Sequence, residues 1–222
     1  TAQVFIVVQP VNRAPVAGDD LITTLEDQAT SFNVLSNDID PEFTSISVSR
    51  INGTLIGSLT SPLTLPEGSL AFAANGAMTF TPNANYNGTV TFTYAVSDGS
   101  LETTATVTIN VLSLNDAPTV VATPAAVNVV EDAVPTVVDL SGVFTDVENP
   151  TGLVLTATSS NGSLVSTSLS GTNLTLGYTP NASGTSVITV TATDPNGASV
   201  STTFTVTVAA VNDAPVVSGP VS

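Results

Sequence analysis

Apolar and polar residues alternate along most of the chain, and short polar turns interrupt the alternation at frequent intervals. A period of two residues is typical of strands that bury one face, and no stretch follows the period of a helix. Thr and Val dominate these stretches, and both residues favour strands. The pattern predicts seven strands in each half of the chain. They cover residues 16–24, 31–34, 45–51, 69–73, 77–81, 90–97 and 103–111, and then 119–129, 136–140, 153–159, 163–168, 173–179, 186–193 and 199–208.

An internal repeat divides these strands into two modules. Three segments align without gaps: TAQVFIVVQPVNRAP, TATVTINVLSLNDAP and STTFTVTVAAVNDAP, which end at Pro15, Pro118 and Pro215. The intervals of 103 and 97 residues match the size of one β-sandwich module, about 100 residues. We therefore predict an all-β chain with two tandem immunoglobulin-like or cadherin-like sandwiches, arranged end to end. The predicted parts are 1–10, the last strand of a preceding repeat; 11–114, module one; 115–211, module two; and 212–222, a linker and the start of a following repeat.

Composition excludes several classes of function. The formal net charge is −16, the only basic residues are Arg13 and Arg50, and the chain has no Lys, His, Cys or Trp. A Ser-His-Asp triad, a Cys nucleophile and a His/Cys zinc site are therefore excluded, and we expect no enzymatic activity. Such an acidic chain repels nucleic acid and anionic lipid, and no apolar run is long enough for membrane insertion.

The 18 acidic residues lie mainly in loops and recur in the same order in the two modules. An acidic pair follows the first strand, a D-x-D or D-x-E motif follows the second, and a single Asp precedes the last strand. Antiparallel strand directions place the pair at one end of a module and the other acids at the opposite end. The junction between the modules then collects Glu26, Asp27, Asn115, Asp116, Asp146, Glu148 and Asp194.

Carboxylates crowded into one joint repel one another unless a cation lies between them. Ca²⁺ takes about six to eight oxygen ligands and suits this set best, so we predict calcium as the cofactor. The alternative is that the acids lie in loops only because loops are solvated. Further half-sites are expected from Asp38, Asp40 and Asp98 above the joint, and from Glu131, Asp132, Asn212 and Asp213 below it. Arg13 stands where the other linker has Asp116, so the upper site should be weaker.

Several segments resemble the cadherin-like repeats of bacteria, including those of the VCBS type. They are LNDAP (114–118), VNDAP (211–215), LEDQ (25–28), VLSNDIDPE (34–42), TFTPNANYNGTVTFTYAVSDGS (79–100) and VVDLSGVFTDVENP (137–150). Such repeats occur in large secreted adhesins and biofilm proteins, often of the RTX class. The resemblance implies a calcium-rigidified spacer at the cell surface whose partners are neighbouring repeats. It also implies joint ligands at Glu26, Asn115, Asp116, Asp146 and Asp194.

Two alternatives remain open at this stage. A carbohydrate-binding module would need exposed aromatic side chains, and the candidates are Tyr86 and Tyr178. A filament subunit would donate the strand at 1–10 to a neighbouring copy, which is a homotypic contact. Tyr86 is also expected to be a corner residue whose ring packs and whose hydroxyl bonds to the backbone.

Overall fold

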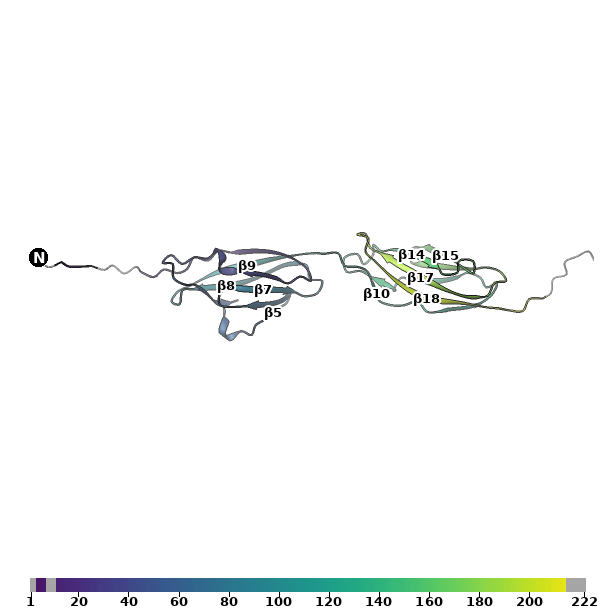
Figure 1. The fold of residues 1–222 in the computed structure, drawn as a ribbon, viewed down its shortest axis with the longest axis horizontal. Helices are drawn as coiled ribbons and strands as arrows, with labels where there is room; N and C mark the ends of the chain where they lie inside the picture. The colour runs from purple at the N-terminus through teal and green to yellow at the C-terminus, as the bar shows by residue number, and fades with distance from the viewer. Residues whose placement is uncertain (1–2, 7–10, 215–222) are drawn as a thin grey trace, which may run out of the picture. The chain divides into compact units, whose positions relative to one another are not determined.

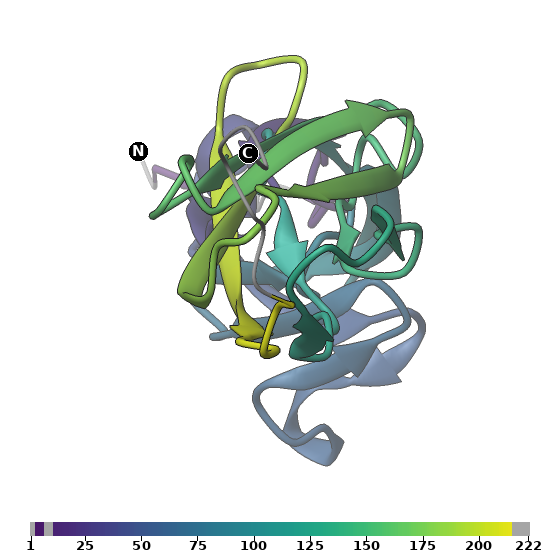
Figure 2. The same ribbon diagram turned by 90° about the vertical axis from the view of Figure 1, so that its right-hand side faces the viewer.

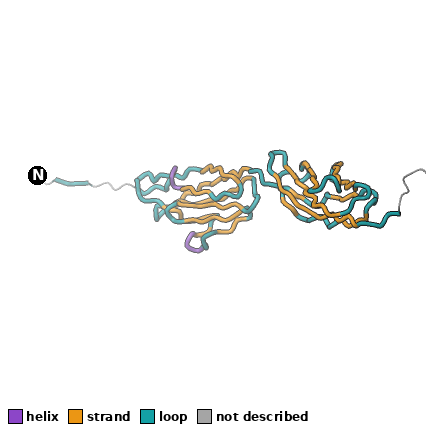
Figure 3. Tube along the Cα trace, turned by 45° about the vertical axis from the view of Figure 1, so that its right-hand side comes forward, coloured by secondary structure: helices purple, strands orange, loops and turns teal. Residues whose placement is uncertain are grey.

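The structure is a computed structural model that describes residues 3–6 and 11–214. The chain divides into two compact units, Thr1–Leu114 and Asn115–Ser222, which are called the first and second unit below. Nearly all of the regular secondary structure in both units is β-strand, which confirms the predicted all-β class, and Figure 3 shows two short helical turns in the first unit.

Each unit is a sandwich of two main sheets (Figures 1 and 2). In the first unit one sheet has the order β1-β9-β8-β3-β4 and the other has the order β2-β7-β6-β5. The strands are β1 (Asp20–Leu25), β2 (Thr30–Asn33), β3 (Ser47–Ile51), β4 (Thr54–Leu55), β5 (Leu63–Leu65), β6 (Gly68–Phe72), β7 (Ala77–Pro82), β8 (Gly88–Ser97) and β9 (Glu102–Leu112), and the short helices are η1 (Val34–Asn37) and η2 (Ile56–Ser58).

The second unit repeats this plan with the orders β11-β18-β17-β14 and β12-β16-β15, and a small additional ladder joins β10 to β13. Its strands are β10 (Thr119–Val120), β11 (Val127–Val130), β12 (Thr136–Asp139), β13 (Phe144–Thr145), β14 (Val154–Ser159), β15 (Val165–Ser170), β16 (Asn173–Tyr178), β17 (Gly184–Thr193) and β18 (Ser199–Ala209).

The first strand of each unit changes its partner part-way along. In the first unit Val16 bridges to Ile39, and β1 then runs parallel to β9. In the second unit β10 pairs with β13, and β11 then runs parallel to β18. The single strand predicted over 119–129 is therefore interrupted between β10 and β11. Pro124 lies in the interruption and cannot donate a ladder hydrogen bond.

Each unit has its own apolar core, which the alternating pattern fills from both sheets. Phe80, Tyr94 and Ile109 are among the fully buried side chains of the first unit. Leu174, Leu176 and Ile188 are among the fully buried side chains of the second core. A core in each half is what allows both modules to fold as sandwiches.

All fourteen predicted strands overlap observed ones, but three short strands were not predicted. These are β4, β5 and β13, of two or three residues each, which is too short for a period to be visible. In Figure 1, β5 and the neighbouring η2 project from the first unit. The strand predicted over 1–10 is absent from residues 3–6, where Val4, Phe5 and Ile6 are exposed, and its other residues lie outside the described part.

Candidate functional site

Five polar residues from three loops of the second unit form a cluster where the chain enters that unit. Asn115 and Asp116 precede β10, Asp146 and Glu148 follow β13, and Asp194 lies in the β17–β18 turn. The Asn115 side chain donates from Nδ2 to Asp194 Oδ2 at 2.7 Å, and the Asp116 backbone N–H donates to Glu148 Oε2 at 3.1 Å. These five residues are called the second-unit cluster. They include all the predicted junction residues that belong to this unit.

Two carboxylate oxygens in this cluster are buried and have no hydrogen-bond donor. Asp146 is only 4% exposed, and while its Oδ1 accepts from the Asn149 backbone at 2.6 Å, its Oδ2 has no partner. Glu148 Oε1 is in the same state. A buried carboxylate oxygen without a donor is costly, so these oxygens are suited to a cation. Within residues 3–6 and 11–214, no three acidic side chains converge closely enough to form a complete metal site.

Asp194 is held in its ionised form by its surroundings. The Asn115 amide lowers the pKa of the Asp194 carboxyl, with further help from backbone donors. Those donors include the N–H groups of Asn196 and Ala198, which both bond to Oδ1. The Asn196 side chain in turn donates to Asn115 Oδ1 at 2.6 Å. The turn therefore presents a fixed, charged oxygen to the linker, which hard cations favour.

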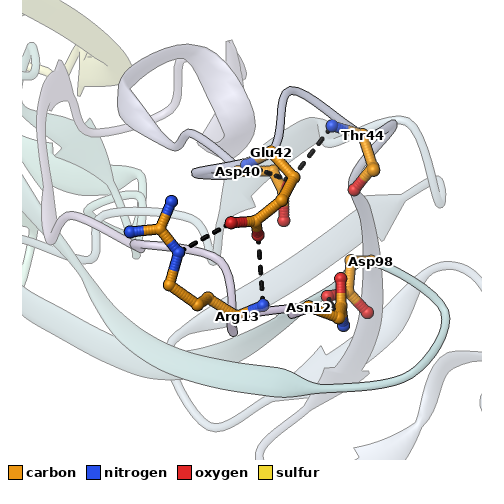
Figure 4. Close-up of polar contacts among 6 residues, drawn as sticks. All are labelled: Asn12, Arg13, Asp40, Glu42, Thr44 and Asp98. Carbon is orange, nitrogen blue, oxygen red and sulfur yellow. Dashed lines mark hydrogen bonds and ion pairs between the residues drawn. The ribbon is translucent and has the colours of Figure 1, made fainter. Parts of the chain in front are cut away.

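The first unit has an equivalent cluster, shown in Figure 4. Asn12 Nδ2 donates to Asp98 Oδ2 at 2.9 Å, and the Arg13 backbone N–H donates to Glu42 Oε2 at 3.1 Å. Asp40 Oδ1 accepts from the backbone N–H groups that follow it, while its Oδ2 is buried without a donor. Asn12, Arg13, Asp40, Glu42 and Asp98 are called the first-unit cluster.

The equivalence changes the residues assigned to the upper half-site. Asp40 and Glu42 correspond to Asp146 and Glu148, so Glu42 and Asn12 belong to the cluster although they were not predicted as site residues. The D-x-E spacing of Asp146 and Glu148 was the signal that could have found Glu42. Asp38 lies elsewhere, because its two oxygens accept from the Gly18 backbone and the Tyr94 hydroxyl inside the unit.

The predicted acidic pairs lie where the chain leaves each unit. Glu26 is fully buried and accepts from the Leu114 backbone N–H, and Glu131 accepts from Val211 in the same way. Each Glu follows the strand that runs parallel to the last strand, so it reaches the chain directly after that strand. The paired residues are engaged in turns: Asp27 and Asp132 have φ of 58° and 62°.

The remaining predicted site residues are turn or linker residues. Asp27 accepts from the Asn85 backbone and Asp132 from the Asn181 backbone, both at 3.0 Å, so each closes a loop next to its Glu. Asn212 and Asp213 are exposed, and the Asn212 amide donates to the Asp213 carbonyl.

None of the three tyrosines is exposed. Tyr94 is buried, and the partly buried Tyr86 and Tyr178 pack against the cores. The Tyr86 hydroxyl bonds to the Thr89 carbonyl at 3.3 Å, and the Tyr178 hydroxyl bonds to Thr136 Oγ1 at 2.7 Å. The sugar platform considered from the sequence therefore has no support from these side chains.

Residues 12–110 and 115–207 each match the family model of the bacterial Ig domain. The chain belongs to the bacterial Ig domain family. The two bacterial Ig domains correspond to the two units, and the predicted tandem β-sandwich architecture is confirmed. This membership suggests a structural or adhesion repeat of an extracellular protein.

Solved structures show that the bacterial Ig domains of this chain have cadherin-like folds. Human Protocadherin-24 EC1-2 is 17% identical, with 90% of this chain and 100% of that chain covered and a TM-score of 0.60. Mouse Cadherin-23 EC22-24 is 20% identical, with 90% and 65% covered and a TM-score of 0.56. The chain covers only 30% of an endo-fucoidan hydrolase from glycoside hydrolase family 107, at 18% identity over 93% of this chain and a TM-score of 0.34. No curated protein is significantly similar in sequence.

The described residues of the two bacterial Ig domains include no helix that is long and apolar enough to span a membrane.

Proposed function

We propose that the chain is a pair of spacer repeats from an extracellular bacterial adhesion protein, and that calcium stiffens the connection between them. The observation that carries the proposal is the pair of buried, donor-free oxygens on Asp146 and Glu148. They lie in a cluster that also holds the linker residues Asn115 and Asp116 through hydrogen bonds.

The donor set of this cluster fits calcium. It offers carboxylate oxygens and the Asn115 amide, and the chain has no His or Cys that would favour zinc or copper. Calcium would offset two of the three negative charges that Asp146, Glu148 and Asp194 carry. The prediction that Glu26 of the first unit also contributes stays a prediction.

Binding at this cluster would act on the linker. Leu114 is held to the first unit by Glu26, and the next residue, Asn115, is held to the second unit by Asp194. A cation that fixes Asn115 and Asp116 would restrict the bonds about which the connection bends. At a tenfold excess over Kd the gain is about 1.4 kcal/mol, enough to bias a hinge.

A stiff connection between repeats is the property that a spacer needs. Tandem repeats of this kind would hold an adhesive part of the protein away from the cell surface, in a biofilm or at a host surface. The RTX-type adhesins suggested by the sequence are one such setting. Within this proposal neither unit carries out catalysis.

The test is a calorimetric titration of calcium into the parent chain and into the double variant Asp146→Asn, Glu148→Gln. We expect the parent to bind with Kd on the order of 10⁻⁴–10⁻³ M. The variant should bind at least about tenfold more weakly. Asp139→Asn is the control, because Asp139 is exposed and its carboxylate accepts hydrogen bonds from Ser141, outside the cluster. A parent that takes up no calcium, or a double variant that binds as the parent does, contradicts the proposal.

A further inference from the structure

The two clusters share one hydrogen-bonded frame and differ at one residue. An Asn side chain donates to the Asp of the last turn in both, at 2.9 Å from Asn12 and 2.7 Å from Asn115. The next backbone N–H donates to the Glu of the D-x-E motif at 3.1 Å in both. That next residue is Arg13 in the first unit and Asp116 in the second, so the same position carries a positive charge in one cluster and a negative charge in the other.

The Arg13 side chain donates to Glu42 Oε1, whereas the equivalent oxygen of the second unit, Glu148 Oε1, has no donor. Glu42 uses Oε2 for the Arg13 backbone, and its Oε1 accepts from Arg13 Nε at 2.6 Å (Figure 4). Glu148 uses Oε2 in the same way, but its Oε1 is buried without a donor. The Glu42 side chain is 13% exposed and the Arg13 side chain 67% exposed, so the guanidinium covers the carboxylate from the solvent side.

The first-unit cluster has the other features expected of a cation site. Asp40 is 4% exposed, and its Oδ2 has no donor. The remaining cation of the chain, Arg50, pairs with Glu102 and not with this cluster. Arg13 is therefore the positive charge that the described residues supply to these carboxylates.

We propose that the Arg13 guanidinium takes the place of calcium in the first unit, so that the chain itself supplies the cation that faces Glu42 and this cluster does not respond to calcium. The inference rests on the proposed function only in that the second-unit cluster binds calcium. It implies that a change in calcium concentration would act on one end of this tandem pair and leave the other unchanged.

The test is a calcium titration followed by amide chemical shifts in two-dimensional NMR spectra of the full chain. Thr44 and Leu101 report on the first-unit cluster, and Asn149 and Ala198 report on the second, since each N–H bonds to a cluster Asp. In the parent, only the second pair should shift with calcium. Arg13→Asp should give Thr44 and Leu101 saturable shifts, and Asp116→Arg should weaken calcium binding at the second pair by at least about tenfold.

Arg50→Asp is the matched control, because it makes the same charge change at a residue that pairs with Glu102 and not with the cluster. Thr44 is the reporter in this control, since Leu101 is next to Glu102, and the Thr44 amide should not shift with calcium. A parent whose Thr44 and Leu101 shift together with Asn149 and Ala198 overturns this inference while the proposed function stands. An Arg13→Asp variant that stays folded, but whose Thr44 and Leu101 amides do not shift with calcium, also overturns it. A parent with no saturable shift at any of the four amides overturns the proposed function instead.

Discussion

Asp20 lies on β1 near two other carboxylates, Asp19 and Asp38. Burial raises the pKa of the Asp20 carboxyl above its ordinary value of 3.8, the Tyr94 hydroxyl partly offsets this, and the two neighbouring carboxylates raise it further. The native state therefore holds the Asp20 proton more tightly than the unfolded state does. The stabilising effect is fully present below pH 3.8 and is lost as the pH rises through the raised pKa.

Asp20→Asn should therefore stabilise the first unit at neutral pH, by about 0.5 kcal/mol, because it removes a charge that burial disfavours and that the carboxylates of Asp38 and Asp19 also repel. Thermal unfolding at several pH values measures this. The gain over the parent should be largest near pH 7 and should vanish below the ordinary pKa, where the parent carboxyl is protonated. A gain that is independent of pH would mean that the ionised Asp20 carboxylate is not its cause.

Single residues also show what the sequence could and could not predict about the site. Loop position and recurrence were enough to identify Asp146, Glu148 and Asp194 as one group. They did not separate Asp38 from Asp40, because D-I-D and D-P-E overlap in sequence and only the fold shows which oxygen is engaged inside the unit. The ion pair between Arg13 and Glu42 could not be predicted from the sequence either, because only the fold brings these two side chains together.

At the scale of elements, alternation predicted the long strands because one face of each is buried. On β9, for example, every second residue from Ala105 to Val111 is buried. It did not predict β13, because two residues are too few to show a period, although Phe144 packs against the core and the strand pairs with β10. The alternation also predicted β10 and β11 as one strand. The chain changes its partner strand between them, from β13 to β18, and the hydrophobic period does not show such a change.

The pairing of β6 and β7 leads to a prediction about Gly68. A Cβ at this position would overlap the carbonyl oxygen of Thr81 and lie 3.0 Å from the Phe80 ring, which is fully buried. Gly68→Ala should destabilise the first unit by about 2 kcal/mol, the usual cost of overpacking a core. Gly57→Ala is the matched control, because a Cβ there meets nothing within 4 Å, and it should change stability by less than about 0.5 kcal/mol. Chemical denaturation compares the two, and equal effects would contradict the predicted overlap at Gly68.

At the scale of the whole chain, the dominant feature is its charge of −16. Both arginines are engaged with glutamates, Arg13 with Glu42 and Arg50 with Glu102. Neither arginine therefore supplies a cation to the carboxylates of the second-unit cluster. In the proposed function that cation is calcium, and the property it controls is the freedom of the linker at Asn115 and Asp116.

Small-angle X-ray scattering of the parent chain, in calcium and in chelator at matched ionic strength, tests this central claim most directly. Matching the ionic strength with NaCl separates specific binding from general screening of the charge. We expect calcium to lengthen the maximum dimension and narrow the distance distribution, because a fixed linker removes bent conformations. The Asp146→Asn, Glu148→Gln variant should scatter alike in both conditions. Superimposable parent profiles with and without calcium would contradict the account.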